Sequence, residues 1–499
     1  MAFVVGAGPL VTRSNKGWNR GMPPRGRCIV RCTQQLSKPV GSEEDEKLQG
    51  RDMTATVREF VTEESLESAD ETRALDLEVQ RISEGRAAES RRAVIEHGSD
   101  STRAVHGGER VKGGKKAKAI LDAISTPVVM SSTFTFRNSA ECIMYNMGSY
   151  QSFEYGRYGN PTVRSAEEKL MALERAEDAL ISASGMNAAT TMLLALVPEN
   201  GHIVVTTDCY RRTRQFIRTL LPKMGIRATV IDPADLATFE RILKTEGATL
   251  FFSESPTNPQ LRVVDVPGVV ALCKKYDVIS VIDTTFATPV NCKPVTMGAD
   301  LVIHSGTKYL AGHNDVLCGA LAGRADLVAD VRALHGVLGG VVDPHAAYLL
   351  IRGMKTLELR IEQQNRTAEK LAAFLQHHPK ISRVWYPTIP DHPDYETAKK
   401  QECKGWGGVL SFEIAGPTFE KSTFDAANRF VDALKIPYIG PSLGGTESLV
   451  EQVCIMGYFD QPLEARMDLG ITNGFIRFAC GIESTNDIID DVAQALKAV

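Results

Sequence analysis

The chain has 499 residues, 43% apolar and 24% charged, a composition typical of a soluble globular protein with several domains. No apolar run approaches the ~20 residues that a transmembrane helix needs, which excludes a membrane-spanning protein. The ten cysteines show no CxxC pair and no zinc-ligand spacing, so we expect reduced thiols and no metal site. The first 42 positions hold seven of the 57 basic residues and no acid, leaving 50 basic and 61 acidic residues, a net charge of −11 that argues against a nucleic-acid partner.

The N-terminal region divides into two segments of different composition. Residues 1–32 are basic without a long hydrophobic run, which predicts an organelle transit peptide or, alternatively, a disordered basic arm. Residues 33–95 are rich in Glu, Ser, Arg and Ala and have few large apolar side chains. Such a segment cannot bury enough surface to offset its ordering entropy, so we predict a disordered acidic linker. A helical periodicity over 66–82 leaves room for a transient helix or a partner-binding segment.

From about residue 96 the chain alternates short apolar runs with helical patterns, which predicts an α/β fold with a mostly parallel sheet. Several of the predicted strands are apolar at consecutive positions, as expected when helices cover both faces of a sheet. The predicted strands are 179–182, 202–206, 228–231, 249–253, 278–282 and 301–304. Each ends in a small or polar cluster, and ligands of such sheets bind at the carboxyl ends of the strands.

Five of these clusters carry chemistry. Gly185 and Met186 lie in the turn between a predicted strand and the helical run 188–196, where backbone N–H groups and the helix dipole favour an anion such as phosphate. Asp283 follows a buried strand, where an acid needs a cation or a ligand. Lys308 follows another, in Ser-Gly-Thr-Lys, where partial desolvation would lower its pKa as Schiff-base chemistry requires.

The remaining two clusters add an aromatic ring and an amide. Tyr210 and Asn258 each lie just after a predicted strand, at the same edge as the other three clusters. Each residue alone has a structural explanation, such as a helix-capping aspartate or a core tyrosine. Together, a phosphate site, an acid for a ring nitrogen, a flat aromatic and a lysine match the needs of pyridoxal 5′-phosphate (PLP).

Several motifs resemble the Cys/Met-metabolism family of PLP enzymes, over about residues 102–499. They are Tyr-Gly-Arg-Tyr-Gly-Asn-Pro-Thr at 155–162, Ser-Gly-Met at 184–186, Glu-Ser-Pro-Thr-Asn-Pro at 254–259 and His-Ser-Gly-Thr-Lys-Tyr at 304–309. Within that family, Thr-Thr-Asp-Cys-Tyr-Arg at 206–211 and Gly-His-Asn-Asp-Val-Leu at 312–317 resemble the plant cystathionine γ-synthases. Since those enzymes are imported into plastids, the resemblance implies a plastid destination for this chain.

The resemblance also implies the type I PLP-dependent transferase fold, as in aspartate aminotransferase. We expect an N-terminal arm at 96–159, a PLP-binding domain at 160–353 with a mostly parallel sheet covered on both faces, and a smaller α/β C-terminal domain at 354–499. The implied assembly is a homotetramer, a dimer of dimers with shared active sites. Its partners would be small-molecule substrates, with no nucleic acid and no membrane.

The family pattern assigns roles to twelve residues of this chain. Lys308, Tyr210 and Asp283 would be catalytic and would also bind the cofactor, with Lys308 attached to it and Asp283 at its pyridine nitrogen. The further cofactor-binding residues would be Gly185, Met186, Ser305, Thr307, Asn258 and, from the neighbouring subunit, Tyr155 and Arg157. Arg477, Ser442 and Tyr210 would bind the substrate, with Arg477 on its α-carboxylate.

The implied reaction is a γ-replacement that joins an activated L-homoserine, expected to be O-phospho-L-homoserine, to L-cysteine. The product is L-cystathionine, an intermediate of methionine biosynthesis. Residues 144–153 contain no lysine, whereas the plant enzymes are basic there, so the donor phosphate has no assigned partner. A cystathionine β-lyase or γ-lyase, a sulfhydrylase, or a non-catalytic scaffold acting through residues 42–94 stay open as alternatives.

Overall fold

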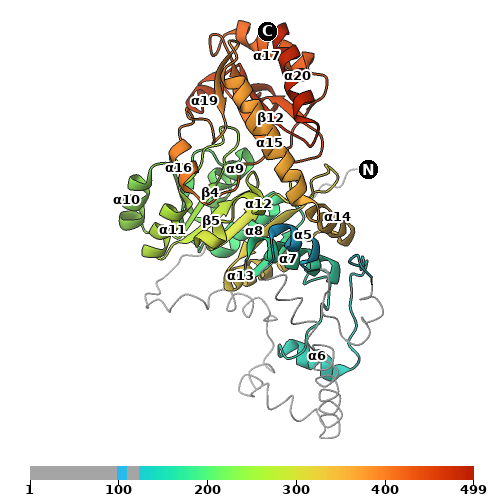
Figure 1. Ribbon diagram of the computed structural model, residues 1–499. Helices are drawn as coiled ribbons and strands as arrows, with labels where there is room; N and C mark the ends of the chain where they lie inside the picture. Colours follow the sequence, from blue (N-terminus) through green and yellow to red (C-terminus); the bar gives the residue numbers. More distant parts are fainter. Residues whose placement is uncertain (1–97, 109–122) are drawn as a thin grey trace, which may run out of the picture. The chain divides into compact units, whose positions relative to one another are not determined.

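The computed structural model describes residues 98–108 and 123–499 (Figure 1). The predicted transit peptide, linker and 66–82 helix lie outside the described residues. Two short helices, α5 (Asp100–His106) and α6 (Ser139–Asn146), precede the first sheet. Within the part of the chain that the structure describes, no helix is both long and apolar enough to cross a bilayer.

A seven-stranded mixed sheet lies in the first half of the body, which we define as the segment from α7 (Pro161–Glu174) to α14 (Pro344–Met354). Its strand order is β1-β7-β6-β5-β4-β2-β3, with the strands at Asp178–Ser182, Gly319–Gly323, Leu301–His304, Ile279–Asp283, Leu250–Glu254, His202–Thr206 and Arg227–Ile231. Strands β3, β2, β4, β5 and β6 are parallel, whereas β7 runs antiparallel to both of its neighbours. The prediction of a mostly parallel sheet is confirmed, and the six predicted strands agree with the observed ones to within one residue at either end.

Helices cover both faces of this sheet because successive strand side chains point to opposite faces. In β2, Ile203 and Val205 pack in one apolar cluster with helices α8, α9 and α13, whereas Val204 packs in another with α10 and α11. The helices of this half are α7 (Pro161–Glu174), α8 (Gly185–Leu196), α9 (Arg211–Thr219), α10 (Leu236–Glu246), α11 (Val266–Lys275), α12 (Thr288–Asn291), α13 (Ala325–Leu338) and α14 (Pro344–Met354).

The second half holds a five-stranded sheet in the order β10-β11-β12-β9-β8. Its strands are Tyr438–Ile439, Leu449–Gln452, Phe475–Ala479, Val409–Ile414 and Ile381–Trp385, and its helices are α15 (Leu357–Gln376), α16 (Tyr395–Lys400), α17 (Lys421–Ala433), α18 (Val453–Met456), α19 (Leu463–Asp468) and α20 (Thr485–Ala495). The long helix α15 runs from the first half toward this sheet (Figure 1). One apolar cluster extends from α7 and α14 through α15 to β9 and β12, so the two halves share a core.

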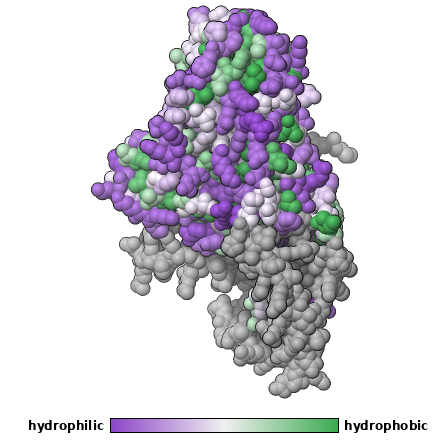
Figure 2. Space-filling view, in the orientation of Figure 1, coloured by the Kyte–Doolittle hydropathy of each residue, from purple (hydrophilic) through white to green (hydrophobic). Residues whose placement is uncertain are grey.

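The surface seen in Figure 2 is mostly hydrophilic, and apolar residues lie in small groups among polar ones.

Among the described cysteines, Cys292 and Cys403 form a disulfide, so the expectation that all cysteines are reduced is wrong for this pair. Their Cα atoms are 4.7 Å apart although 111 residues separate them along the chain. Only the fold brings them together, which is why their spacing in the sequence gave no sign of the bond.

Candidate active site

The predicted site residues gather where the parallel strands end. Asp283 closes β5, Glu254 closes the neighbouring β4 in register with it, and Lys308 follows β6 after three residues. Tyr210 lies between β2 and α9. Because these strands run in the same direction, their ends place all four residues at one edge of the sheet.

Lys308 extends from the turn after β6 toward the second half of the body. Its ammonium Nζ lies 2.8 Å from Ser442 Oγ, to which it donates a hydrogen bond. Burial, with a smaller effect of the positive charge of Arg477, lowers the pKa of Lys308 to about 8, although Glu451 opposes the shift. A buried lysine with this pKa is partly neutral near pH 8, which is the form that attacks a carbonyl carbon.

Asp283 is a buried acid held by Thr285. Its Oδ1 accepts hydrogen bonds from the backbone N–H of Thr285 at 2.9 Å and from the Thr285 hydroxyl at 2.6 Å. Burial raises the pKa of Asp283, because the interior disfavours an unpaired carboxylate. A cationic ring N–H beside it would reverse that preference, so the chemistry of this acid suits a pyridine nitrogen.

Glu254 lies beside Asp283 on the neighbouring strand and contacts the backbone of Tyr210. Burial, together with the neighbouring Asp283, raises the pKa of Glu254 well above its usual value. Its carboxyl group accepts the backbone N–H of Tyr210, which fixes the start of α9. The Tyr210 side chain is 46% exposed, so its ring is free to face a ligand.

The turn from β1 into α8 lies directly against the turn after β6. A Cβ atom added to Gly185 would come within 3.0 Å of both Cα and Cβ of Ser305, so glycine allows this approach. Ser184 caps α8 by accepting the N–H of Asn187, whereas the N–H groups of Gly185 and Met186 have no partner within the helix. Free N–H groups, the helix dipole and the Ser305 hydroxyl form a donor set that suits phosphate.

Arg477 projects from β12 into the same region and is 7% exposed. Its Nη1 donates to Asn258 Oδ1 at 3.1 Å and its Nη2 to the carbonyl of Ser442 at 2.9 Å. Glu451, opposite it on β11, lies 3.2 Å from Nη2, and burial raises the pKa of that acid. The guanidinium is thus oriented by both halves of the body.

Three predicted residues have other contacts in this structure. The Arg157 guanidinium donates to the carbonyl of Gly336 in α13 at 3.1 Å and lies over the rings of Tyr155 and Tyr158. The Thr307 hydroxyl bonds to the backbone of Cys318, the residue before β7. It would have to exchange its contact with the Cys318 carbonyl for a phosphate oxygen.

Sequence reasoning missed three residues of the site. Glu254 begins the motif 254–259 and Thr285 lies two residues after Asp283, but nothing in the sequence shows that Thr285 orients Asp283 or that Glu254 accepts the Tyr210 N–H. Glu451 was not recognised because β11 was not predicted. Its partnership with Arg477 depends on the register of two strands that are far apart in the sequence.

These residues fit PLP. The Gly185–Ser305 approach and the α8 amides suit the phosphate, Asp283 suits the ring nitrogen, and Lys308 has the lowered pKa of a carbonyl-reactive amine. Each of the three positions therefore agrees with the cofactor suggested by the sequence.

Comparisons with known proteins agree with the assignment of PLP as the cofactor. The chain is 53% identical over 401 residues to cystathionine γ-synthase 1, chloroplastic, of Arabidopsis thaliana (80% of this chain, 69% of the relative) and 52% identical over 401 residues to that of Nicotiana tabacum (80% and 72%). A crystal structure of cystathionine γ-synthase from Xanthomonas oryzae pv. oryzae, in complex with aminoacrylate and cysteine, superposes with a TM-score of 0.72 at 32% identity, covering 80% of this chain and 98% of that one. The family model for Cys/Met metabolism PLP-dependent enzymes matches residues 102–497, and the chain belongs to that family.

Proposed function

We propose that this protein is a cystathionine γ-synthase. It joins O-phospho-L-homoserine to L-cysteine and releases L-cystathionine, a step of methionine biosynthesis. The observation that carries the proposal is the identity of 53% and 52% to two plant enzymes of that name, each over 401 residues. The geometry supports it, because Lys308, Asp283 and Tyr210 lie at one edge of the seven-stranded sheet, and Ser442 contacts both Lys308 and Arg477.

Lys308 is the residue that holds the cofactor and moves protons. PLP, when bound, supplies an electron sink for the bonds broken at the substrate α-carbon. Lys308 Nζ removes the α-proton and returns a proton at a neighbouring carbon, which its tether and lowered pKa allow. Asp283, at the end of β5, would hold the ring nitrogen protonated, and the half-exposed Tyr210 would lie against the ring.

Arg477 and Ser442 orient the amino-acid substrate. The guanidinium binds the α-carboxylate through two parallel hydrogen bonds, with Asn258 and the Ser442 carbonyl holding it in place. Ser442 Oγ, 2.8 Å from Lys308 Nζ, holds the amine toward the same region. The donor then loses its γ-substituent, and the cysteine thiolate adds at Cγ.

A lyase of the same family is the second candidate. Cystathionine β-lyase of Lactococcus lactis and cystathionine γ-lyase of Bacillus subtilis are 34% and 35% identical to this chain. The higher identity to the plant synthases favours γ-replacement over elimination. The contacts at Lys308 and Arg477 suit both reactions, so the products must separate them.

The test is a comparison of donors with the purified protein. O-Phospho-, O-succinyl- and O-acetyl-L-homoserine are each incubated with L-cysteine, and products are identified by mass. We expect cystathionine from all accepted donors and the highest kcat/KM with the phosphate ester. Pyruvate or 2-oxobutyrate as the main product would identify a lyase, and preference for another ester would reject the phosphate donor.

We further propose a homotetramer, a dimer of dimers, acting in the plastid stroma. The contacts of Arg157 with the Gly336 carbonyl in α13 and with the Tyr155 ring, rather than with the residues around Lys308, support sites completed by the neighbouring subunit. The basic segment 1–32 and the word chloroplastic in the names of two relatives support plastid import.

A further inference from the structure

The loop that carries Asn258 is closed by two hydrogen bonds between Thr257 and Arg262. Residues 255–265 connect β4 to α11, and Asn258 in this loop presents its Oδ1 to Arg477. At the base, the N–H of Arg262 donates to Thr257 Oγ1 at 2.9 Å, and the N–H of Thr257 donates to the Arg262 carbonyl at 3.0 Å. The backbone of Arg262 therefore sets where Asn258 lies.

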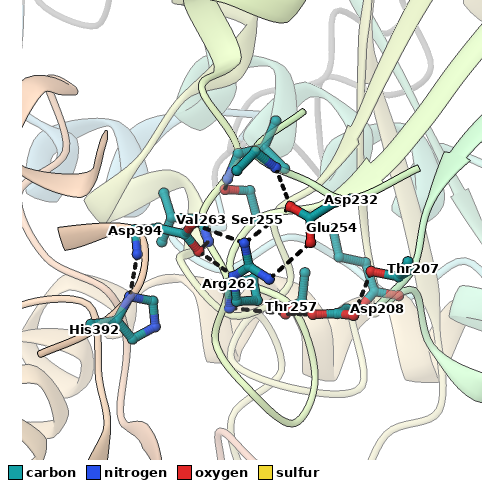
Figure 3. A network of polar contacts seen from close by, with 12 residues as sticks. Thr207, Asp208, Asp232, Glu254, Ser255, Thr257, Arg262, Val263, His392 and Asp394 are labelled. Carbon is teal, nitrogen blue, oxygen red and sulfur yellow. Dashed lines mark hydrogen bonds and ion pairs between the residues drawn. The ribbon is translucent and has the colours of Figure 1, made fainter. Parts of the chain in front are cut away.

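The side chain of Arg262 fastens this loop to the second half of the body (Figure 3). Its Nε and Nη2 lie 2.7 and 3.1 Å from the two carboxylate oxygens of Asp394, in a bidentate pair. The N–H of Val263 also donates to Asp394 Oδ2, at 2.8 Å. The Asp394 side chain is 2% exposed, so little solvent screens the pair.

Asp394 and Arg477 belong to the same half of the body. Two weaker contacts attach the loop there as well: Ser411 Oγ donates to the Pro259 carbonyl at 2.7 Å, and Gln260 Nε2 donates to the Leu469 carbonyl at 3.0 Å. The bidentate pair is the only one of these attachments in which both partners are charged. It thus carries the strongest constraint on how Asn258 meets Arg477.

We propose that Arg262 and Asp394 are positioning residues for the α-carboxylate site. Their ion pair holds the Asn258 loop against the half that carries Arg477, so that the guanidinium presents its free N–H groups to the carboxylate. Neither residue touches the substrate. The inference rests on the carboxylate-binding role proposed above for Arg477.

Asp232 provides a matched control. It accepts hydrogen bonds from the same guanidinium, at 3.2 and 3.4 Å, but its side chain is 51% exposed and it follows β3 in the first half of the body. Asp394→Asn and Asp232→Asn make the same chemical change at the same arginine. Only the first loosens the attachment between the halves.

The experiment titrates the holoenzyme with glycine and with glycinamide, followed by the cofactor absorbance. Displacing a binding group by a fraction of an ångström weakens binding steeply, so Asp394→Asn should raise the glycine dissociation constant about tenfold and that of glycinamide, which has no carboxylate, less than about twofold. Asp232→Asn should change neither. Arg262→Lys, which keeps the charge but not the bidentate geometry, should give an intermediate effect and serves if Asp394→Asn does not fold.

Arg477→Gln is the reference variant. If it weakens glycine selectively and Asp394→Asn and Arg262→Lys do not, the positioning role is wrong while the role of Arg477 stands. If Arg477→Gln weakens both ligands equally, the carboxylate assignment fails and the positioning role fails with it. An equal effect of Asp394→Asn and Asp232→Asn would also overturn the proposal, because it would show that the attachment to the second half is not what matters.

Discussion

At the scale of single residues, the site contains ionisable groups whose charged forms are disfavoured by burial. Burial lowers the pKa of Lys308 and raises those of Asp283 and Glu254, so each group tends toward its neutral form before a ligand arrives. Arg477 stays paired with Glu451 and with two hydrogen-bond acceptors. Such arrangements are typical of functional sites rather than of structural cores.

The lowered pKa of Lys308 predicts how the apoenzyme takes up PLP. Only the neutral amine attacks the cofactor aldehyde, so the rate of uptake should rise with pH through about 8 and then level off, rather than climb toward the ordinary lysine value of 10.5. Stopped-flow absorbance after mixing apoenzyme with PLP measures this rate. Arg477→Gln, which removes a nearby positive charge, should move the midpoint upward, and a wild-type midpoint near 10.5 would contradict the account.

At the scale of elements, the site forms where the carboxyl ends of the parallel strands lie beside the N-terminus of α8. The approach of α8 to the turn after β6 is set by Gly185, where any side chain meets the Ser305 backbone. Backbone cannot yield as the end of a flexible side chain can. The two turns would separate, and the N–H groups of α8 would move away from Ser305.

Gly185→Ala should therefore weaken PLP binding. We expect the dissociation constant to rise by about tenfold or more, since a shifted donor set loses part of its charge-assisted bonding. Equilibrium titration of the apoenzyme measures it. Gly457→Ala is the control, because its Cβ would meet only Val453 O at an ordinary 3.6 Å. Unchanged affinity in Gly185→Ala would remove α8 from the phosphate site.

The same scale shows what the sequence could predict. The strands of the parallel sheet were found because runs such as Ile-Val-Val in β2 are buried on both faces and therefore apolar at every position. Strand β7, Gly-Ala-Leu-Ala-Gly, was missed because small residues carry little strand signal, although it fills the space between β1 and β6. The Arg262–Asp394 pair was beyond prediction, since 132 residues separate its members.

At the scale of the whole molecule, the proposed dimer leads to a prediction about shared active sites. Lys308 and Arg157 lie in different surroundings within one chain, yet both are expected at the cofactor. If Arg157 acts in its neighbour's site, a mixed dimer of Lys308→Ala and Arg157→Ala subunits contains one site with both residues intact. The other site carries both defects.

Mixing the two inactive variants at limiting PLP should therefore restore activity. Native mass spectrometry confirms that subunits exchange, and a steady-state assay measures the gain. Each variant mixed with itself is the control. Exchange without any return of activity would place Arg157 in its own subunit's site and reject the shared arrangement.

The central claim, γ-replacement, is tested most directly by following the carbon of the second substrate. The purified protein is given O-phospho-L-homoserine and uniformly ¹³C-labelled L-cysteine, and the products are measured by mass spectrometry together with released phosphate. The account predicts cystathionine that carries the whole label of cysteine, formed in equal amount to the phosphate. Labelled pyruvate, or unlabelled 2-oxobutyrate released without cystathionine, would contradict it.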